Sequence, residues 1–555
     1  MSYLSPLQFT VKRVVPALTI AGVGVWATVT TVNDDWDDYI PNFSSNASSE
    51  KSEKIVILGG GWAGLNALRK CAGPGKDIVV VSPRPHFLYT PLLAGSAVGT
   101  ITLRSACEPL RALVNSAAAK ASSATFIRAH AREVDLVNKK VHATTGEDGL
   151  TLQLKYDKLI VAVGSMANTF GIPGVQENAL FLKEAEDSAR LHAKLLSNLE
   201  KASALMSYGA GDGNRNRYDG EIDKLLKIVI VGAGPTGVEL SAEMSDFAHK
   251  EVRQRYGAAV SARVRIILVE ALPRILGPFD ENIAKTAKEH LIERGVEVRT
   301  CMAVTRAGFE EVTLAPSTPR SATPEEKKAA LDLAETEDVG IIVWAAGIGT
   351  RPLVKKIAKA LGQKDMRGLK VDPMLRVEGT EGVYAIGDAA LAGYAPTAQV
   401  AAQEGKHIGR AIRDGKDSPF TYTHGGSLCT LGQNDGIAQL VVGNGNNSIW
   451  DAIGAPTAGK DGDQRVITGS AAFVMWRSVY WTKLLSNSSR LHLSMDWLSS
   501  MLSGRDVVEP VLQRSPTRPP PVESFGTPLQ RNPSIRIKKE PTPKEAKKIK
   551  KFLLF

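Results

Sequence analysis

The sequence predicts an α/β fold with two similar units, followed by a C-terminal region with amphipathic helices. Two glycine-rich turns predict the two units, because each follows a short apolar run typical of a buried strand and precedes a helical pattern. A third strand-like run, far along the chain, ends in Asp388 and indicates that the first unit is completed after the second. The 555 residues suffice for three or four domains, and the mean hydropathy of -0.09 excludes a polytopic membrane protein.

Residues 1–53 are predicted to be a targeting or membrane segment followed by a linker. An apolar run over residues 14–32 is about as long as a single transmembrane helix. It follows Lys12 and Arg13 and precedes several aspartates, so the flanking charges favour a body across the membrane from the N-terminus. A cleaved organellar presequence, which is also poor in acidic residues, is the alternative.

The first glycine-rich turn lies in residues 54–170, the predicted first part of the first unit. The run over 55–58 predicts a strand and residues 63–71 predict a helix. Gly59 permits the tight turn, Gly61 lets backbone N–H groups approach a pyrophosphate, and Gly64 lets helix and strand pack closely. This is the fingerprint of a Rossmann-type dinucleotide-binding unit.

The second strand of this unit, predicted over 78–81, lacks the acidic residue that usually follows it. Ser82, Pro83 and Arg84 stand there instead. A serine can bond a ribose hydroxyl, and an arginine can reach adenine or a phosphate. Gly164, at the end of a later predicted strand, is assigned to the same site.

The second turn lies in residues 171–347 and repeats the pattern. Its strands are predicted over 228–231, 265–270 and 340–344, and its helix over 237–249. Segments 206–220 and 315–338 are expected to be a polar loop and a surface insertion. The residues assigned to the turn are Gly232, Gly234, Pro235, Thr236 and Gly237.

Glu270 ends the second strand of this unit. A carboxylate there can accept hydrogen bonds from both adenosine ribose hydroxyls, and it would repel a 2′-phosphate. The second unit is therefore predicted to bind NADH in preference to NADPH.

Residues 348–424 are predicted to return to the first unit. Asp388 ends a strand and can hold the ribitol or pyrophosphate arm of a flavin. The helix that begins near Ala398 can direct its positive end at the flavin ring. This pairing predicts that the first unit holds FAD.

Residues 425–508 form a predicted C-terminal region, and residues 509–555 a basic, Pro-rich disordered tail. Two apolar rows at helical spacing and neighbouring cations predict a helix pair on an anionic membrane surface. A helix packed on the protein core, or a dimer interface, is the alternative. The rows are Phe473, Trp476, Tyr480 and Leu484, and Leu491, Met495, Leu498 and Leu502.

Composition argues against a metal site and against nucleic acid as a partner. The four cysteines have no metal-ligand or dithiol spacing, and the EF-hand-like residues near 212–223 lack the required glycine. Most of the formal charge of +10 lies in the tail after residue 508, so the body of the protein carries little of it.

Together these residues resemble the type II, or alternative and rotenone-insensitive, NADH:ubiquinone oxidoreductases. Ser82-Pro83-Arg84 and the segment 396–404 are the more specific parts of the resemblance, which covers about residues 54–508. The other matching stretches are 54–64, 87–93, 168–174, 231–240, 269–273, 344–347, 384–388, 495–498 and 504–506.

The resemblance implies noncovalent FAD in the first unit, NADH in the second, and a membrane quinone as acceptor. It implies hydride transfer to flavin N5, then two electrons to ubiquinone, without proton pumping. It places Gln399 and Gln403 near the flavin–quinone region, Glu239 near the nicotinamide or the quinone proton path, and Gly347 at the NADH site. It implies the mitochondrial inner membrane, with the intermembrane-space side favoured over the matrix side, and a second copy of the chain is a candidate partner.

Two other classes remain open from sequence. A sulfide:quinone oxidoreductase shares the double fold, but it needs cysteines beside the flavin. A flavoprotein like apoptosis-inducing factor would use its basic surface for nucleic acid, whereas the charge here lies in the tail.

Overall fold

The computed structural model describes residues 52–146, 149–211, 217–319, 321–432, 434–441, 457–458 and 464–508. The apolar run over 14–32 and the tail from 509 onward lie outside these residues. Within them, no helix combines the length and the apolar character that a membrane span needs.

The first glycine-rich turn belongs to a five-stranded parallel sheet. Its strands stand in the order β21-β9-β1-β2-β5, so a strand from late in the chain completes the edge. The central residues of these strands are apolar and buried, as expected for a parallel sheet that is covered on both of its faces. The strands are β1 (Glu53–Leu58), β2 (Lys76–Ser82), β5 (Ser123–Arg128), β9 (Lys158–Val161) and β21 (Val383–Ala385).

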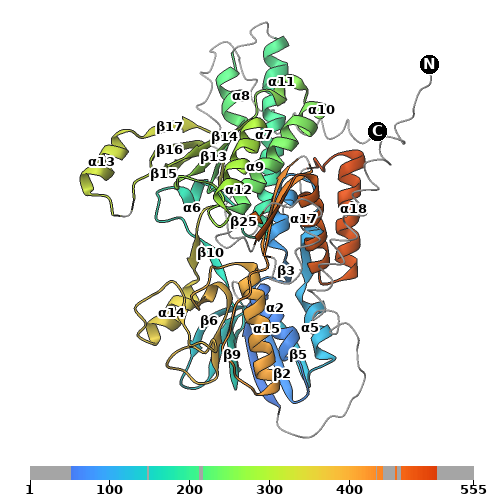
Figure 1. Ribbon diagram of the computed structural model, residues 1–555, viewed down its shortest axis with the longest axis vertical. Helices are drawn as coiled ribbons and strands as arrows, with labels where there is room; N and C mark the ends of the chain where they lie inside the picture. The colour runs from blue at the N-terminus through green and yellow to red at the C-terminus, as the bar shows by residue number, and fades with distance from the viewer. Residues whose placement is uncertain are drawn as a thin grey trace, which may run out of the picture. The chain divides into compact units, whose positions relative to one another are not determined.

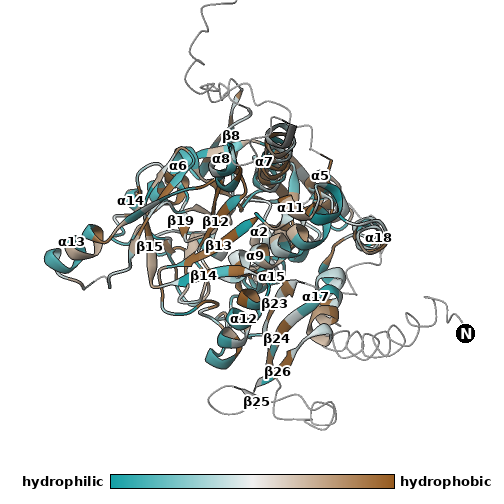
Figure 2. Ribbon diagram, turned by 90° about the horizontal axis from the view of Figure 1, so that it is seen from above, coloured by the Kyte–Doolittle hydropathy of each residue, from teal (hydrophilic) through white to brown (hydrophobic). Residues whose placement is uncertain are grey.

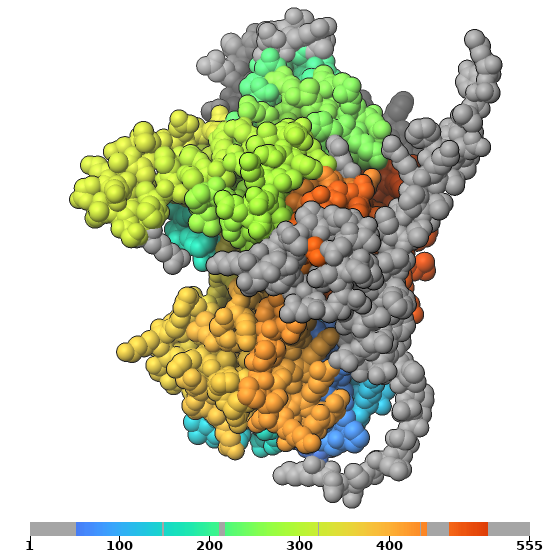
Figure 3. Space-filling view, in the orientation of Figure 1, coloured from blue at the N-terminus to red at the C-terminus, as the bar shows by residue number. Residues whose placement is uncertain are grey.

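Helices α2 (Trp62–Cys71) and α15 (Ala398–Asp414) lie side by side although they are far apart in sequence (Figures 1 and 3). Two glycines of α15 allow this close approach. A Cβ on Gly405 would lie 2.3 Å from the carbonyl oxygen of Ala63, and one on Gly409 would lie 2.6 Å from that of Ala67. The two helices therefore touch backbone to backbone.

The second glycine-rich turn belongs to another five-stranded parallel sheet, in the order β11-β18-β12-β13-β14. Its central strands β12 and β13 carry hydrophobic residues (Figure 2). Helices α7 (Ala185–Gly211), α9 (Pro235–Phe247) and α12 (Glu281–Glu293) accompany this sheet. The strands are β11 (Leu180–Phe181), β12 (Lys227–Val231), β13 (Arg265–Glu270), β14 (Val296–Thr300) and β18 (Ile341–Trp344).

A short antiparallel pair connects the two sheets. Strand β10 (Ser165–Ala167) leads out of the first sheet, and β19 (Ile348–Thr350) pairs with it on the way back. The predicted boundaries at residues 170 and 347 lie beside this pair.

One sequence-based expectation for this region was wrong in part, and the structure adds detail to another. The polar loop expected from residue 206 is helical up to Gly211, because Ala204, Leu205 and Met206 continue the helix into the glycine-rich stretch. The insertion expected over 315–338 contains α13 (Pro324–Asp332), which a capping box between Thr323 and Glu326 begins, and the strand β17 (Glu335–Asp338). Strand β17 pairs with β16 (Glu311–Pro316), so this segment belongs to a three-stranded sheet.

The C-terminal region is an antiparallel sheet followed by two helices. The two apolar rows that sequence assigned to one membrane surface have different surroundings. Trp476 and Leu484 of the first row are buried, whereas every member of the second row is exposed, from 45% for Leu498 to 73% for Leu502. The elements are β23 (Ser427–Gly432), β24 (Asp435–Val441), β25 (Thr457–Ala458), β26 (Gln464–Thr468), α17 (Ser470–Lys483) and α18 (Asn487–Ser503).

Candidate active site

A cavity of about 570 Å³ lies at the carboxyl edge of the first sheet. Residues from both glycine-rich turns and from the returning segment line it. Every residue predicted for the FAD site except Gly64 contributes to this lining: Gly59, Gly61, Ser82, Pro83, Arg84, Gly164, Asp388 and Ala398.

The glycines of the first turn have the geometry that a dinucleotide requires. A Cβ on Gly59, which has φ +111°, would lie 2.2 Å from the carbonyl oxygen of Ala162, and one on Gly64 would lie 2.0 Å from that of Gly59. In contrast, a Cβ on Gly61 would meet nothing closer than 3.7 Å, because Gly61 faces the cavity. Gly64 therefore serves the packing of helix on strand, and Gly61 leaves backbone open to a ligand.

Asp388 lies at the centre of a small polar cluster on the cavity wall. The Ser165 hydroxyl donates to its carboxylate at 2.5 Å, and the Lys183 ammonium lies 4.0 Å from it and 2.9 Å from the Ser165 oxygen. Burial lowers the pKa of Lys183, with Asp388 opposing that effect. Sequence reasoning found Asp388 but missed its two partners.

A second cluster on the same wall was also missed. Glu184 pairs with Arg84 at 2.8 Å and with Arg351 at 3.3 Å. The carboxylate thereby fixes two guanidinium groups beside the cavity, and both have donors that suit phosphate oxygens. Glu184 lies near the start of the second unit and Arg351 just after its end, so no local pattern links them.

Two long helices direct their N-termini at this cavity. Gly61 and Ala63 line it at the start of α2, and Thr397 and Ala398 line it at the start of α15. The unpaired N–H groups and dipoles at such ends favour negative charge. Beside them Glu404 is 1% exposed and accepts from the Gly387 N–H at 2.5 Å, and burial raises its pKa to about 7.

The second turn repeats the geometry of the first. Gly232 has φ +100°, and its Cβ would lie 2.8 Å from the Cα of Ala346. A Cβ on Gly237 would lie 1.9 Å from the Gly232 carbonyl oxygen, while Gly234 has open space around it. Pro235 is the first helical residue of α9, and Thr236 lines the same cavity as the first turn.

Glu270 is held at the mouth of this turn. Its two carboxylate oxygens accept from the backbone N–H of Ala233 at 2.8 Å and of Leu272 at 2.9 Å. A carboxylate oxygen has further acceptor capacity, so these bonds leave room for ribose hydroxyls. Gly347 has φ +65°, and the ring of Phe170 lies where its Cβ would stand.

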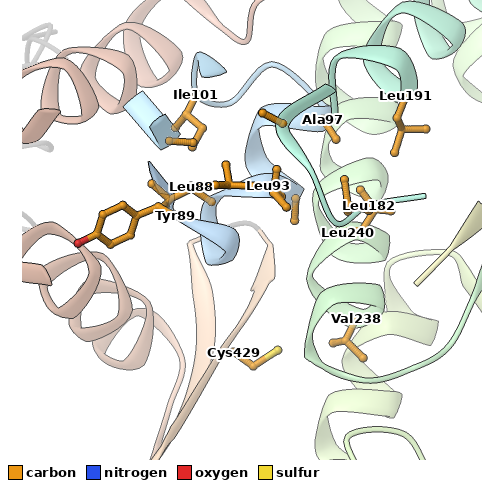
Figure 4. Packing of buried hydrophobic residues seen from close by; sticks show 14 of the residues in the cluster. Leu88, Tyr89, Leu93, Ala97, Ile101, Leu182, Leu191, Val238, Leu240 and Cys429 are labelled. Carbon is orange, nitrogen blue, oxygen red and sulfur yellow. The ribbon is translucent and has the colours of Figure 1, made fainter. Parts of the chain in front are cut away.

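Glu239 is buried, with 6% exposure, between α9 and the C-terminal region. Its carboxyl accepts from the Trp476 indole N–H at 3.2 Å and from the Thr430 N–H at 3.3 Å. Burial raises its pKa to about 8. Figure 4 shows its neighbours Val238 and Leu240 on α9, with Cys429 on the facing strand. Glu239 is therefore a buried acid and not an exposed residue of the helix surface.

Gln399 and Gln403 hold one loop with both ends of their amides. Gln399 donates to the Gly426 carbonyl at 2.8 Å and accepts from the Gly425 N–H at 3.2 Å. Gln403 donates to the Thr423 carbonyl at 2.7 Å and accepts from its N–H at 3.0 Å. Neither glutamine lines the cavity of the first turn, although Ala398 and Ala401 of the same helix do.

Comparison with known proteins agrees with this architecture. Residues 53–405 match the pyridine nucleotide-disulphide oxidoreductase family, and residues 424–506 match the NDH2 C-terminal domain. An external NADH-ubiquinone oxidoreductase 2 of Saccharomyces cerevisiae mitochondria is 31% identical over 505 residues, covering 84% of each chain. The chain belongs to the type II NADH:ubiquinone oxidoreductase family.

Other relatives of the type II oxidoreductases extend the comparison. An internal alternative NAD(P)H-ubiquinone oxidoreductase A1 of Arabidopsis thaliana mitochondria is 32% identical, over 83% of this chain and 87% of that one. The structure of NDH2 from Plasmodium falciparum in complex with NADH has the same fold, with a TM-score of 0.68 and 24% identity over 83% of this chain and all of that one. The predicted family, fold class, activity and cofactors are confirmed.

The residues of this type II oxidoreductase fit FAD at the first turn. Gly61 leaves room for a pyrophosphate against backbone N–H groups, two helix N-termini point there, and Arg84, Lys183 and Arg351 supply positive charge. Ser82, 1% exposed, ends β2 where a ribose would lie. No cysteine is among the described residues that line the cavity, which argues against sulfide:quinone oxidoreductase chemistry.

Proposed function

We propose that the two turns hold FAD and NADH at one shared cavity, from which electrons pass to ubiquinone. The observation that carries this proposal is the place of Thr236. It belongs to the NADH turn, yet it lines the same cavity as Gly59 and Gly61 of the FAD turn. Direct transfer requires the reacting atoms to be held within contact distance, and adjoining turns favour that arrangement.

The chain's own residues bind and orient the two cofactors. Gly234 and the start of α9 receive the NADH pyrophosphate, and Glu270 accepts from the adenosine ribose. Arg84 and Arg351, fixed by Glu184, hold the phosphates of FAD. When bound, FAD supplies a two-electron carrier between NADH and quinone.

Glu239 is the proposed proton donor for the quinol. Reduction of ubiquinone consumes two protons, and a carboxyl whose pKa is about 8 is protonated at neutral pH. Gln399 and Gln403 are proposed to act at the quinone side by fixing the loop 423–426. The loop begins the C-terminal region whose helix α17 supplies Trp476 to Glu239.

The activity is tested with the purified, flavin-loaded protein and a short-chain ubiquinone. We expect NADH oxidation that depends on the quinone and resists rotenone. Protein heated past its unfolding transition, with the same amount of free FAD, is the control for chemistry by the flavin alone. NADH oxidation at the same rate without quinone would contradict the proposal.

The exposed row of α18 is the proposed membrane contact. Leu491, Met495, Leu498 and Leu502 are each at least 45% exposed, and they lie three or four residues apart on one helix. Removing such a row from water stabilises binding to a bilayer surface. Replacement of Leu491 and Leu498 by Gln should abolish sedimentation with vesicles, whereas the same replacement of exposed Leu331 and Leu333 on another element should leave it unchanged.

The intermembrane-space side of the mitochondrial inner membrane is the proposed location. The charges around residues 14–32 support it, as does likeness to an external enzyme from yeast. The Arabidopsis relative is named an internal enzyme, so the matrix side is the competing outcome. Protease added to mitochondria with a ruptured outer membrane should digest the protein; protection until the inner membrane is also opened would place it in the matrix.

A further inference from the structure

A second cavity lies away from both glycine-rich turns, between α5 (Leu110–Ala118) and the N-terminal end of α18. Its volume is about 640 Å³. Among the residues that the structure describes, none lines both this cavity and that of the FAD turn. One wall comes from α5 and β4 (Cys107–Pro109), and the other comes from Leu485, Ser486 and the first turns of α18.

Hydrogen bonds fix the two walls against each other. Glu108, on one wall, accepts from the N–H groups of Leu485 at 2.9 Å and Ser486 at 3.1 Å, on the other. Asp496 of α18 accepts from the Thr102 N–H at 2.8 Å and from the Ser105 hydroxyl at 2.6 Å. These contacts hold the cavity open in the absence of a ligand.

The lining combines positive charge with apolar surface. Arg69, Arg104 and Lys120 are cationic, while Glu108, the one carboxylate among the described lining residues, is already bonded to backbone N–H groups. Further lining comes from the apolar side chains of Leu113, Ala117 and Leu485. Such a site suits a molecule with one anionic end and one apolar end.

His86 contributes a polar side chain to the cavity wall. It lines the cavity, and its Nε2 is buried without a hydrogen-bond partner among the described residues. A buried ring nitrogen without a partner costs stability.

The cavity opens beside the exposed row of α18. His492 lines the cavity, and Met495, three residues further along the same helix, is 57% exposed. Leu491, next to His492, is 63% exposed. Residues three apart are neighbours on a helix surface, so the cavity and the apolar row are continuous.

We propose that this cavity binds the headgroup of an anionic membrane phospholipid, with its acyl chains along the exposed row of α18. Its phosphate lies toward Arg104 and Lys120, and its glycerol region toward the serines at the start of α18. The site anchors and orients the protein on an acidic bilayer. It rests on the proposed membrane contact of α18 but not on the proposed quinone reduction, because none of its described lining residues belongs to the cofactor sites.

The first experiment measures thermal unfolding of the flavin-loaded enzyme with three probes. These are dihexanoyl phosphatidylglycerol, dihexanoyl phosphatidylcholine and glycerol phosphate. A ligand that binds the folded state raises Tm, and we expect a rise with phosphatidylglycerol alone. An equal rise with phosphatidylcholine would show that charge is not recognised. A rise with glycerol phosphate would assign the site to soluble phosphates, and no rise with any probe would exclude the site.

The second experiment removes the charge from the cavity. The pair Arg104→Gln and Lys120→Gln should weaken binding to phosphatidylglycerol vesicles about 25-fold, since each cation near an anionic lipid surface contributes a factor of about five. The pair Lys155→Gln and Arg253→Gln makes the same change in net charge at exposed positions on other elements. An equal loss of vesicle binding in this control pair would show that net charge, and not the cavity, attracts the protein to the membrane, and would contradict the proposal. NADH oxidation with a soluble quinone should stay at the wild-type rate in both pairs, which separates this test from that of the proposed function.

Discussion

Glu239 is an acid in surroundings that favour its neutral form. Hydrogen bonds from Trp476 and Thr430 lower the pKa of the carboxyl, but burial outweighs them and raises it to about 8. The family resemblance identified this residue but could not show its burial, because the residues that cover it come from the C-terminal region.

Glu239→Gln tests this residue. Because the wild-type carboxyl loses its proton as pH rises through about 8, quinone-dependent kcat should fall over that range. The amide should lower kcat about 100-fold and remove this pH dependence. Stopped-flow reduction by NADH, which needs no proton donor, should keep its wild-type rate. Glu289→Gln, at an exposed position of α12, is the control.

The raised pKa of Glu239 also predicts how the stability of Glu239→Gln relative to wild type changes with pH. The folded-state pKa is above the ordinary value of 4.5, so the folded protein binds more protons than the unfolded chain between those values. The free energy of unfolding of the wild type therefore falls as pH rises from 4.5 toward 8, because the unfolded chain ionises while folded Glu239 keeps its proton. The Tm of Glu239→Gln relative to wild type should increase over this range; a constant difference would contradict the raised pKa.

Glu270 has two sets of hydrogen-bond partners, one in the glycine turn and one in the proposed cofactor. It accepts from Ala233 in the glycine turn, and its remaining acceptor capacity suits ribose hydroxyls. Glu270→Ser should raise the ratio of kcat/KM for NADPH to that for NADH about tenfold or more, because a charge-assisted hydrogen bond contributes about 1.5–3 kcal/mol. Glu293→Ser on α12 is the control. An unchanged ratio would show that Glu270 does not select the cofactor.

At the scale of elements, Gly64 and Gly61 of the first turn are needed for different reasons: Gly64 for packing and Gly61 for access of the cofactor. Gly64→Ala should destabilise the fold by about 1–3 kcal/mol, because its Cβ would overlap the Gly59 carbonyl oxygen. Gly61→Ala should keep the wild-type Tm without cofactor, since its Cβ has open space, and should lose FAD affinity. Thermal unfolding and flavin absorbance per chain measure the two effects. Equal unfolding temperatures for both variants would contradict this division of roles.

The sequence could predict those parts of the fold and of the site that depend on residues close together in the chain. The glycine turns were recognisable because strand, turn and helix are contiguous. The ion pairs of Glu184 with Arg84 and Arg351 were not, because three distant segments meet there. Gly405 and Gly409, spaced to allow close helix contact, carried a signal that was missed. The spacing of apolar residues also could not distinguish the two helices, since both rows have the same period. The row of α17 includes the buried Trp476 and Leu484, whereas the row of α18 is exposed.

At the scale of the whole molecule, the first sheet depends on residues on both sides of the second. Strand β21 completes its edge beside β9, and α15 covers α2. A chain that ends at residue 370 would keep both glycine turns but lose β21, Asp388 and α15. We expect it to retain no FAD on purification, whereas a chain that ends at residue 508 should retain it fully. Full flavin content in the shorter chain would show that the first unit is complete without its returning segment.

The strand order also sets the sequence of events during synthesis. The second sheet is contiguous in the chain, so it can form as soon as residue 344 has emerged. The first sheet must wait with β9 unpaired on one side until residues 383–385 arrive, and such long-range pairing is slow. The part of the protein that is made first is therefore the last to be finished, and until then its apolar strand edge is exposed to chaperones and to other unfinished chains.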